Sequence, residues 1–273
     1  MLGSLLIVFR EVIEAGLIVG IVLAATKGVP HRAQWVAYGV VTGLFGACLV
    51  AAFAGQIAAP FGGSGQEIFN ASVLFLAVGM LTWHNVWMAG HGREIAADVR
   101  RVGAAVATGE RSLSALAIVV GIAVLREGSE VVLFLYGIAS QGGSSLTTML
   151  VGGALGLASG AAVSALMYFG LLAIPTHRLF DVTSGLITLL AAGMAAQAIL
   201  FIQQGGYLEF LTSAVWDTSW LLPQDSILGR LLHTLIGYSD APNGAQLVFY
   251  LLTIGGIGGL TRLERGRSYP KSR

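Results

Sequence analysis

Two short charged motifs are the residues of this chain best placed to do chemistry, because each interrupts a long apolar stretch. Residues 10–14 read Arg-Glu-Val-Ile-Glu and residues 126–130 read Arg-Glu-Gly-Ser-Glu, so both have the pattern R-E-x-x-E, 116 positions apart. On a helix, glutamates three positions apart share a face, and an arginine can pair with a glutamate four positions on. Each motif therefore predicts two carboxylates on one helix face with a guanidinium beside them.

Oxygen ligands at this density favour a hard, highly charged metal ion. Each charge at the centre of a bilayer costs on the order of 3 kcal/mol unless it faces other charges or water. Two facing motifs would bring together four carboxylates and two guanidiniums, a formal charge of −2 that a cation would balance. A structural ion-pair network joining the two motifs is the alternative. The candidate metal ligands are Glu11, Glu14, Glu127 and Glu130, with Arg10 and Arg126 as supporting residues.

The elements that must position these motifs are membrane helices. Of the 273 residues, 55% are hydrophobic and only 11% are charged, whereas a soluble domain carries about a quarter charged residues. This composition excludes an ordinary soluble protein and a disordered one, and the net charge of +1 gives no indication of a nucleic-acid partner. Apolar runs of about 20 residues predict seven membrane-spanning helices. They cover Leu2–Thr26, Trp35–Pro60, Gln66–Ala89, Leu113–Ser140, Leu146–Ile174, Val182–Gln204 and Ala245–Leu263.

An internal repeat relates the first three predicted spans to the next three. Besides the two R-E-x-x-E motifs, residues 76–80 (Leu-Ala-Val-Gly-Met) match residues 190–194 (Leu-Ala-Ala-Gly-Met), and a weaker G-x-x-x-G-L pattern at 39–44 matches 152–157. The offsets of 116, 114 and 113 positions are nearly constant, so chance similarity between apolar segments is a poor explanation. With three spans in each copy, the second copy must insert upside down, as in the inverted repeats of secondary transporters.

We therefore expect an all-α polytopic membrane protein, a single membrane domain over residues 1–273 with seven transmembrane helices. Two inverted three-helix repeats and one extra helix would compose it: repeat one at 1–90, repeat two at 113–204, an outer loop at 205–244 and the seventh helix at 245–263. The polar segment 91–112 predicts a solvated helix between the repeats. Twelve lysines and arginines fall on one side of the spans and only Arg230 on the other. The positive-inside rule then places the N-terminus outside and the C-terminus in the cytoplasm.

Three further residues are candidates for the path of a cation. The outer loop is acidic, which would concentrate cations at an entrance, and Asp217 and Asp225 are its candidate entrance residues; an ordinary solvated loop is the alternative. His84, in the third predicted span, could relay protons or pass a metal ion inward, or it could be a packing histidine. Residues 227–236 predict a short amphipathic helix that lies at the interface or caps a vestibule.

The paired R-E-x-x-E helices, the seven spans and the external N-terminus resemble the oxidase-dependent high-affinity iron permeases, including the bacterial ferrous/ferric iron permeases. The stretch Trp216-Asp217-Thr218-Ser219-Trp220 adds to the similarity. The resemblance implies iron import across the plasma membrane (the bacterial inner membrane), with the four motif glutamates as iron ligands. Iron would be a transported substrate, and no tightly bound cofactor is expected. The partners implied are the lipid bilayer and an extracytoplasmic oxidase or peroxidase with an iron-delivery protein.

Three other functions remain open at this point. One is a non-transporting membrane scaffold, which purified protein that moves no metal in vesicles would favour. Another hard divalent cation, such as manganese, could be the transported ion. A membrane-embedded metalloenzyme could use the carboxylates as a di-iron site, but such sites normally include Glu-x-x-His, which neither motif provides, so we expect no enzymatic activity. The sequence does not distinguish Fe(II) from Fe(III), a channel from alternating access, or one coupling ion or oligomeric state from another.

Overall fold

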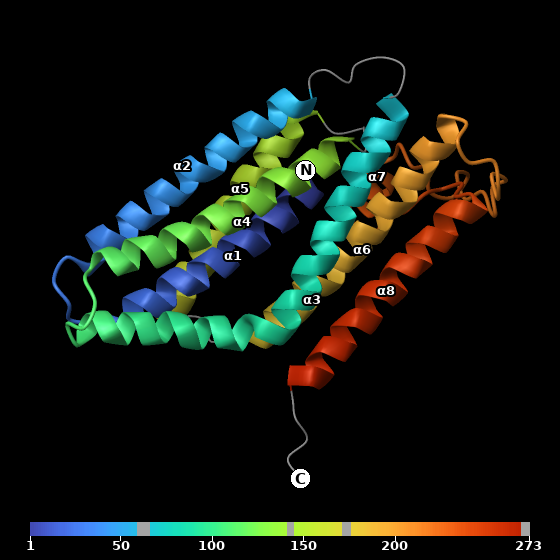
Figure 1. Cartoon of the computed structure of the whole chain (residues 1–273). Helices are drawn as coiled ribbons and strands as arrows, with labels where there is room; N and C mark the ends of the chain where they lie inside the picture. Colours follow the sequence, from blue (N-terminus) through green and yellow to red (C-terminus); the bar gives the residue numbers. More distant parts are fainter. Residues whose placement is uncertain (59–65, 141–144, 171–175, 269–273) are drawn as a thin grey trace, which may run out of the picture.

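The computed structural model describes residues 1–58, 66–140, 145–170 and 176–268. Within these ranges it contains eight α-helices, and the one β-contact is an isolated bridge between Ala214 and Asn243 (Figure 1). The helices are α1 (Leu2–Ala25), α2 (Arg32–Ala58), α3 (Gln66–Ala107), α4 (Ser114–Ser140), α5 (Leu146–Tyr168), α6 (Thr176–Gln204), α7 (Ile227–Ile236) and α8 (Gly244–Ser268). The chain is therefore all-helical, as the sequence predicts.

Each of the seven predicted spans coincides with a helix, and the short helix predicted at residues 227–236 is α7. Residues 59–60 of the second predicted span and 171–174 of the fifth lie outside the described residues. Five helices contain segments long and apolar enough to cross a membrane. They are Arg32–Phe53, Gln66–Gly92, Leu146–Tyr168, Asp181–Gln204 and Gly244–Glu264. The two other long helices, α1 and α4, each carry three charged residues in their R-E-x-x-E motif.

The outward faces of the bundle are apolar. Phe45 and Phe53 on α2 and Leu251 and Leu252 on α8 are exposed. A soluble monomer rarely leaves so much large apolar side chain uncovered, whereas lipid is a suitable solvent for it. The protein is therefore a multi-pass helical membrane protein.

Helix α3 departs from the sequence-based expectation. The predicted span and the polar segment after it form one helix of 42 residues, and Figure 1 shows its second half turning away from its first half. This second half is not simply solvated, because Val99 and Val106 are buried against Val22 of α1 and Leu116 of α4. The segment is amphipathic, and its apolar face covers the ends of the two motif helices.

The helices form two groups (Figure 1). In the first, α1 packs against α5, α2 packs against α4, and α1 and α4 also touch each other. In the second, α3, α6 and α8 pack together, around a core that includes Leu74, Leu81, Ile187 and Met194. The first half of α3 also contacts α1 and α4, so α3 joins the two groups.

Close backbone contacts hold the pairs of the first group together. A Cβ atom added at Gly43 of α2 would lie 2.7 Å from the carbonyl oxygen of Gly121 of α4, and one added at Gly156 of α5 would lie 2.5 Å from that of Leu5 of α1. Gly43 and Gly156 are 113 positions apart, and Leu5 and Gly121 are 116 apart. The α1–α5 and α2–α4 contacts, which we call the glycine seams, are thus equivalent under the sequence offsets of the repeat.

Helix α7 reaches into the bundle rather than lying flat on it. Its N-cap Ser226 accepts a hydrogen bond from the Gly229 amide, and it ends at Gly237, whose φ of 69° is left-handed. A Cβ at Gly193 of α6 would lie 2.6 Å from the Gly237 Cα atom. Gly193 is 11 residues before the end of α6, which at 1.5 Å per residue is about 16 Å along the helix. We call the end of the bundle that carries α7 the α7 side.

The connection between α6 and α7 is held by its own hydrogen bonds. The Tyr238 hydroxyl donates to the Leu222 carbonyl over 2.9 Å, and the Gln224 amide donates to the Asp240 carboxylate over 2.9 Å. Thr218 contributes a hydrogen bond of 3.0 Å from its hydroxyl to the Asp240 carbonyl. Asp240, one of the acidic residues of this loop, therefore has a structural role.

Candidate metal centre

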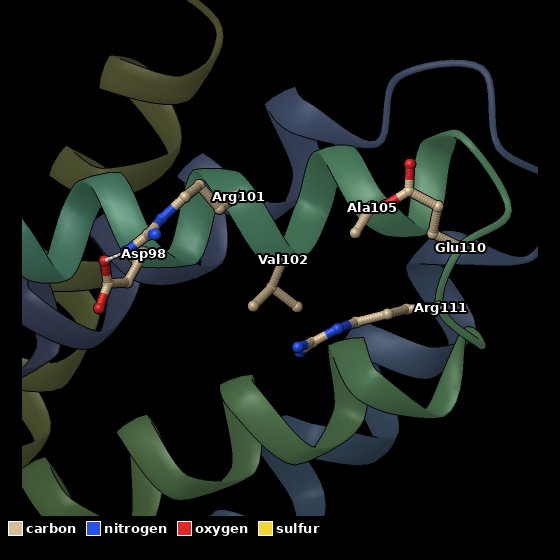
Figure 2. A pocket seen from close by; sticks show the side chains of 6 residues that line it. All are labelled: Asp98, Arg101, Val102, Ala105, Glu110 and Arg111. Atoms are coloured by element: carbon tan, nitrogen blue, oxygen red, sulfur yellow. Dashed lines mark hydrogen bonds and ion pairs between the residues drawn. The ribbon is translucent and has the colours of Figure 1, made fainter.

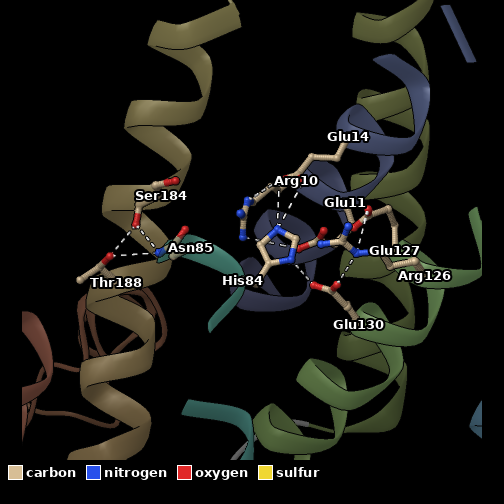
Figure 3. A network of polar contacts seen from close by, with 10 residues as sticks. All are labelled: Arg10, Glu11, Glu14, His84, Asn85, Arg126, Glu127, Glu130, Ser184 and Thr188. Atoms are coloured by element: carbon tan, nitrogen blue, oxygen red, sulfur yellow. Dashed lines mark hydrogen bonds and ion pairs between the residues drawn. The ribbon is translucent and has the colours of Figure 1, made fainter. Parts of the chain in front are cut away.

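The two R-E-x-x-E motifs meet inside the bundle, between α1 and α4, with α3 alongside (Figure 3). Arg10 and Glu11 are each 1% exposed, and Glu14 and Glu127 are each 4% exposed. Because a charged side chain is rarely buried in this way without partners, the contacts within the cluster decide what it can do.

The first motif is internally paired. The Arg10 Nε atom lies 2.9 Å from Glu14 Oε1, in the i, i+4 arrangement that the sequence predicts. The Arg10 Nη1 atom lies farther from Glu11 Oε1, at 3.6 Å. Glu14 is thus held tightly by the guanidinium, and Glu11 only loosely.

The second motif has the same pairing in a more open setting. The Arg126 Nε atom is 3.2 Å from Glu130 Oε1 and 3.8 Å from Glu127 Oε1. The Arg126 side chain is 35% exposed, and its guanidinium carbon lies 4.6 Å from the centre of the Trp87 ring. The cation–π contact therefore helps to stabilise the Arg126 guanidinium, whereas the Arg10 guanidinium is stabilised by carboxylates alone.

His84 of α3 connects the two motifs. Its Nε2 atom lies 3.3 Å from Glu14 Oε2, and its Nδ1 atom faces Glu130 Oε2. The next residue, Asn85, points the other way and donates to the Ser184 carbonyl and the Thr188 hydroxyl of α6, over 3.3 and 3.2 Å. Figure 3 shows these two adjacent residues joining α3 to the motif helices on one side and to α6 on the other.

One ligand atom from each of Glu11, His84, Glu127 and Glu130 lies within 4.8 Å of the others. Protein oxygen and nitrogen ligands bind a first-row metal ion at about 2.0–2.2 Å, so small side-chain movements would let these four atoms surround one cation. Within the described part of the chain, both carboxylate oxygens of Glu11 and Glu127 Oε2 have no hydrogen-bond partner. Buried polar atoms are normally satisfied, so these oxygens are suited to binding a cation.

The structure thus brings together all four glutamates and both arginines that the sequence singles out, and it adds His84 to them. The expected pairing of each arginine with its second glutamate is present. Asn85 and Trp87 were not identified as neighbours of the centre. Asn85 could have been identified because it is a polar residue beside His84 within an apolar span. Nothing in the sequence distinguishes Trp87 from a tryptophan at the membrane interface.

The two acidic entrance candidates do not belong to this cluster. Asp217 and Asp225 lie in the α6–α7 connection and are exposed. Hydrogen bonds from the Ser219 hydroxyl and backbone amide lower the pKa of the Asp217 carboxyl below its usual range. Asp217 is therefore ionised at neutral pH and available to attract cations from solution.

A hollow of about 490 Å³ lies at the surface near the end of α3 (Figure 2). Its lining mixes both signs of charge, and its Arg101 pairs with Asp98 while both side chains remain largely exposed. Exposed pairs of this kind contribute little, and the hollow does not resemble a metal site. Its lining residues are Asp98, Arg101, Val102, Ala105, Glu110 and Arg111.

Comparison with known proteins places this arrangement in a family. The sequence pattern of the iron permease FTR1 family matches residues 1–261. The chain belongs to this family. It is an iron permease, a membrane transporter rather than an enzyme, which agrees with the resemblance of the motif helices.

Several relatives of this permease carry the name ferrous iron permease EfeU. Those of Escherichia coli O157:H7 and Shigella sonnei are each 30% identical over 251 residues, which cover 90% of both chains. The protein of Yersinia pestis is 29% identical over 251 residues, covering 90% of this chain and 88% of its own. No solved structure matches the chain.

Proposed function

We propose that this iron permease imports iron across the plasma membrane, in bacteria the inner membrane, through the centre formed by Glu11, Glu14, Glu127 and Glu130. The observation that carries the proposal is the meeting of two buried motifs whose carboxylate oxygens are partly without hydrogen-bond partners. The centre has more carboxylates than guanidiniums, and this surplus of negative charge favours a bound cation. The carboxylate oxygens would replace the water that the cation loses on entering the centre.

The membrane arrangement we propose has seven spans, with α1 and α4 included because α1 has 24 residues and α4 has 27, enough to cross a bilayer. The matched offsets of the glycine seams support two inverted repeats, at residues 1–90 and 113–204. The lysine and arginine bias supports an external N-terminus and a cytoplasmic C-terminus. On this topology the α7 side is external.

In this arrangement iron enters past the acidic loop, where Asp217 and Asp225 are the proposed entrance residues. The centre lies between the repeats, as substrate sites do in other inverted-repeat transporters. The names of the relatives support iron(II) as the transported form. An extracytoplasmic oxidase or peroxidase and an iron-delivery protein are proposed partners, on the basis of the family resemblance alone.

Uptake of radioactive iron into vesicles containing the purified protein tests the proposal. Glu11→Gln and Glu127→Gln keep the size of the side chain and remove its charge, so we expect at least a tenfold loss of the initial rate for each. Glu94→Gln, which changes an exposed glutamate of α3 outside the centre, is the matched control and should transport normally. Wild-type rates in both glutamine variants would refute the assignment of the site.

A further inference from the structure

We propose that His84 is a metal ligand and that the binding set is asymmetric. Glu11, His84, Glu127 and Glu130 bind the ion, while Glu14 stays outside the set and orients the histidine. This inference rests on the proposed function, because it identifies the ligands and the class of ion at the same centre. It departs from the symmetric set of four glutamates that the repeated motif alone predicts.

The two ring nitrogens of His84 have different surroundings. Nε2 is within hydrogen-bond distance of the Glu14 carboxylate, at 3.4 Å from Oε1 and 3.3 Å from Oε2. Nδ1, on the other edge of the buried ring, is in ion-pair contact with the Glu130 carboxylate. It faces Glu130 Oε2, one of the oxygens of the cluster. Nδ1 is therefore the nitrogen on the side of the cluster, where the proposed ion would lie between His84 and Glu130.

This is the arrangement in which a histidine normally binds a metal ion. A ligating imidazole almost always donates its other N–H to a carboxylate, which fixes the ring and raises its basicity. Glu14 occupies the position of that carboxylate. It is held in turn by Arg10 at 2.9 Å, so a continuous chain of contacts runs from Arg10 through Glu14 and His84 to the centre.

The remaining distances agree with an outer role for Glu14. The four atoms that approach within 4.8 Å of one another come from Glu11, His84, Glu127 and Glu130, and Glu14 is not among them. The first motif thus contributes one carboxylate to the set and the second motif contributes two. The corresponding glutamates Glu14 and Glu130 have different tasks, although the motifs have the same sequence pattern.

The repeat itself cannot supply a second imidazole. The offset of 114 that relates residues 76–80 to 190–194 places Ala198 of α6 at the position equivalent to His84 of α3. Ala198 is fully buried and carries no ligand atom. The asymmetry is therefore built into the sequence and does not depend on one side-chain rotamer.

The ligand set determines the class of ion. Carboxylate-only sites suit Ca²⁺ and Mg²⁺, whereas an imidazole nitrogen favours first-row transition metals. One neutral imidazole and three carboxylates therefore select divalent transition metals, iron(II) among them, against the far more abundant Mg²⁺ and Ca²⁺. We expect His84 to contribute to this discrimination, and the carboxylates to bind the ion with or without it.

X-ray absorption of the purified protein loaded anaerobically with Fe²⁺ tests this directly. We expect scattering from one imidazole in the wild-type protein and in Glu14→Gln, and none in His84→Gln. Fe²⁺ affinity should fall about 10- to 100-fold in Glu14→Gln, as it does when the outer partner of a ligating histidine is replaced. An iron shell without imidazole in the wild-type protein would overturn the inference, whether or not any variant folds.

Transport selectivity provides the second measurement. In vesicles, the Mg²⁺ concentration that halves Fe²⁺ uptake should be at least tenfold lower for His84→Gln than for the wild type. His31→Gln, in the exposed turn between α1 and α2, is the matched histidine control. If His84→Gln keeps wild-type selectivity while Glu127→Gln loses uptake, the inference fails and the proposed function stands. If Glu127→Gln also transports normally, the proposed function itself fails.

Discussion

At the scale of single residues, two arginines with the same sequence context have different environments. Both contact two carboxylates. Arg10 is 1% exposed and contacts them through Nη1 and Nε, whereas Arg126 is 35% exposed and also lies over the Trp87 ring. The guanidinium of Arg10 orients Glu14 through Nε, an atom that lysine does not have. The two arginines should therefore differ in how well lysine replaces them.

We expect Arg10→Lys to lower iron uptake at least tenfold and Arg126→Lys to lower it less. A lysine at position 10 keeps the charge but cannot contact Glu11 and Glu14 from two nitrogens at once. The measurement is the initial uptake rate, normalised to the amount of protein in the membrane. Equal losses in the two variants would show that the buried pairing has no special role.

The residues of the centre also show what a sequence can reveal about a site. The glutamates and arginines were predictable because charged residues inside an apolar span are costly and therefore meaningful. His84 was predicted only as a candidate for the path of a cation, because its contacts with both motifs depend on where α3 lies against α1 and α4. Its position in the chain, 70 residues from Glu14 and 46 from Glu130, carries no information about that packing.

At the scale of helices, length and apolar composition predicted the number of long helices but not all of their ends, since α3 continues to Ala107 beyond the predicted Ala89. The bend of α3 was not predicted, because the apolar pattern that buries Val99 and Val106 is sparse and the surrounding segment is polar. The contacts of α7 were also beyond prediction. A short amphipathic helix can lie on a membrane surface or insert between others, and its own sequence does not distinguish the two.

The glycine seams lead to a prediction about stability. Gly43→Ala and Gly156→Ala should each destabilise the protein by about 1–3 kcal/mol, because the added methyl group meets the backbone of the facing helix. The control is Gly255→Ala on α8, where no atom of the part of the chain that the structure describes lies within 4 Å of the added Cβ atom. There alanine should be neutral or slightly stabilising.

Thermal unfolding of the detergent-purified variants, followed by tryptophan fluorescence, provides the measurement. Because the two seams are equivalent under the repeat offsets, the two seam variants should lose similar amounts of stability. A seam variant that unfolds at the same temperature as Gly255→Ala would contradict the close contact.

At the scale of the whole molecule, the two halves are similar in sequence and unlike in surroundings. Gly193 of α6 is covered by Gly237 at the end of α7. Among the described residues, nothing lies within 4 Å of a Cβ atom added at its repeat counterpart, Gly79 of α3. Helix α7 therefore closes the bundle on one side only. An added methyl group would meet the backbone of Gly237 at position 193 and would meet no such neighbour at position 79.

We expect Gly193→Ala to displace the end of α7 and change iron uptake by at least threefold, with Gly79→Ala as the matched control that behaves like the wild type. Limited proteolysis of the α6–α7 connection should be faster in Gly193→Ala, because its anchor is weakened. Identical cleavage of the two variants would show that α7 does not depend on this contact.

The glycine seams have one more consequence. Helices that touch backbone to backbone have no room to slide past each other, so α1 with α5 and α2 with α4 form two stiff units. A movement that lets an ion through must then occur along the boundary between these units, or between them and α3. The six charged side chains and His84 lie across those boundaries. The residues proposed to bind the ion therefore belong to parts that would move relative to one another.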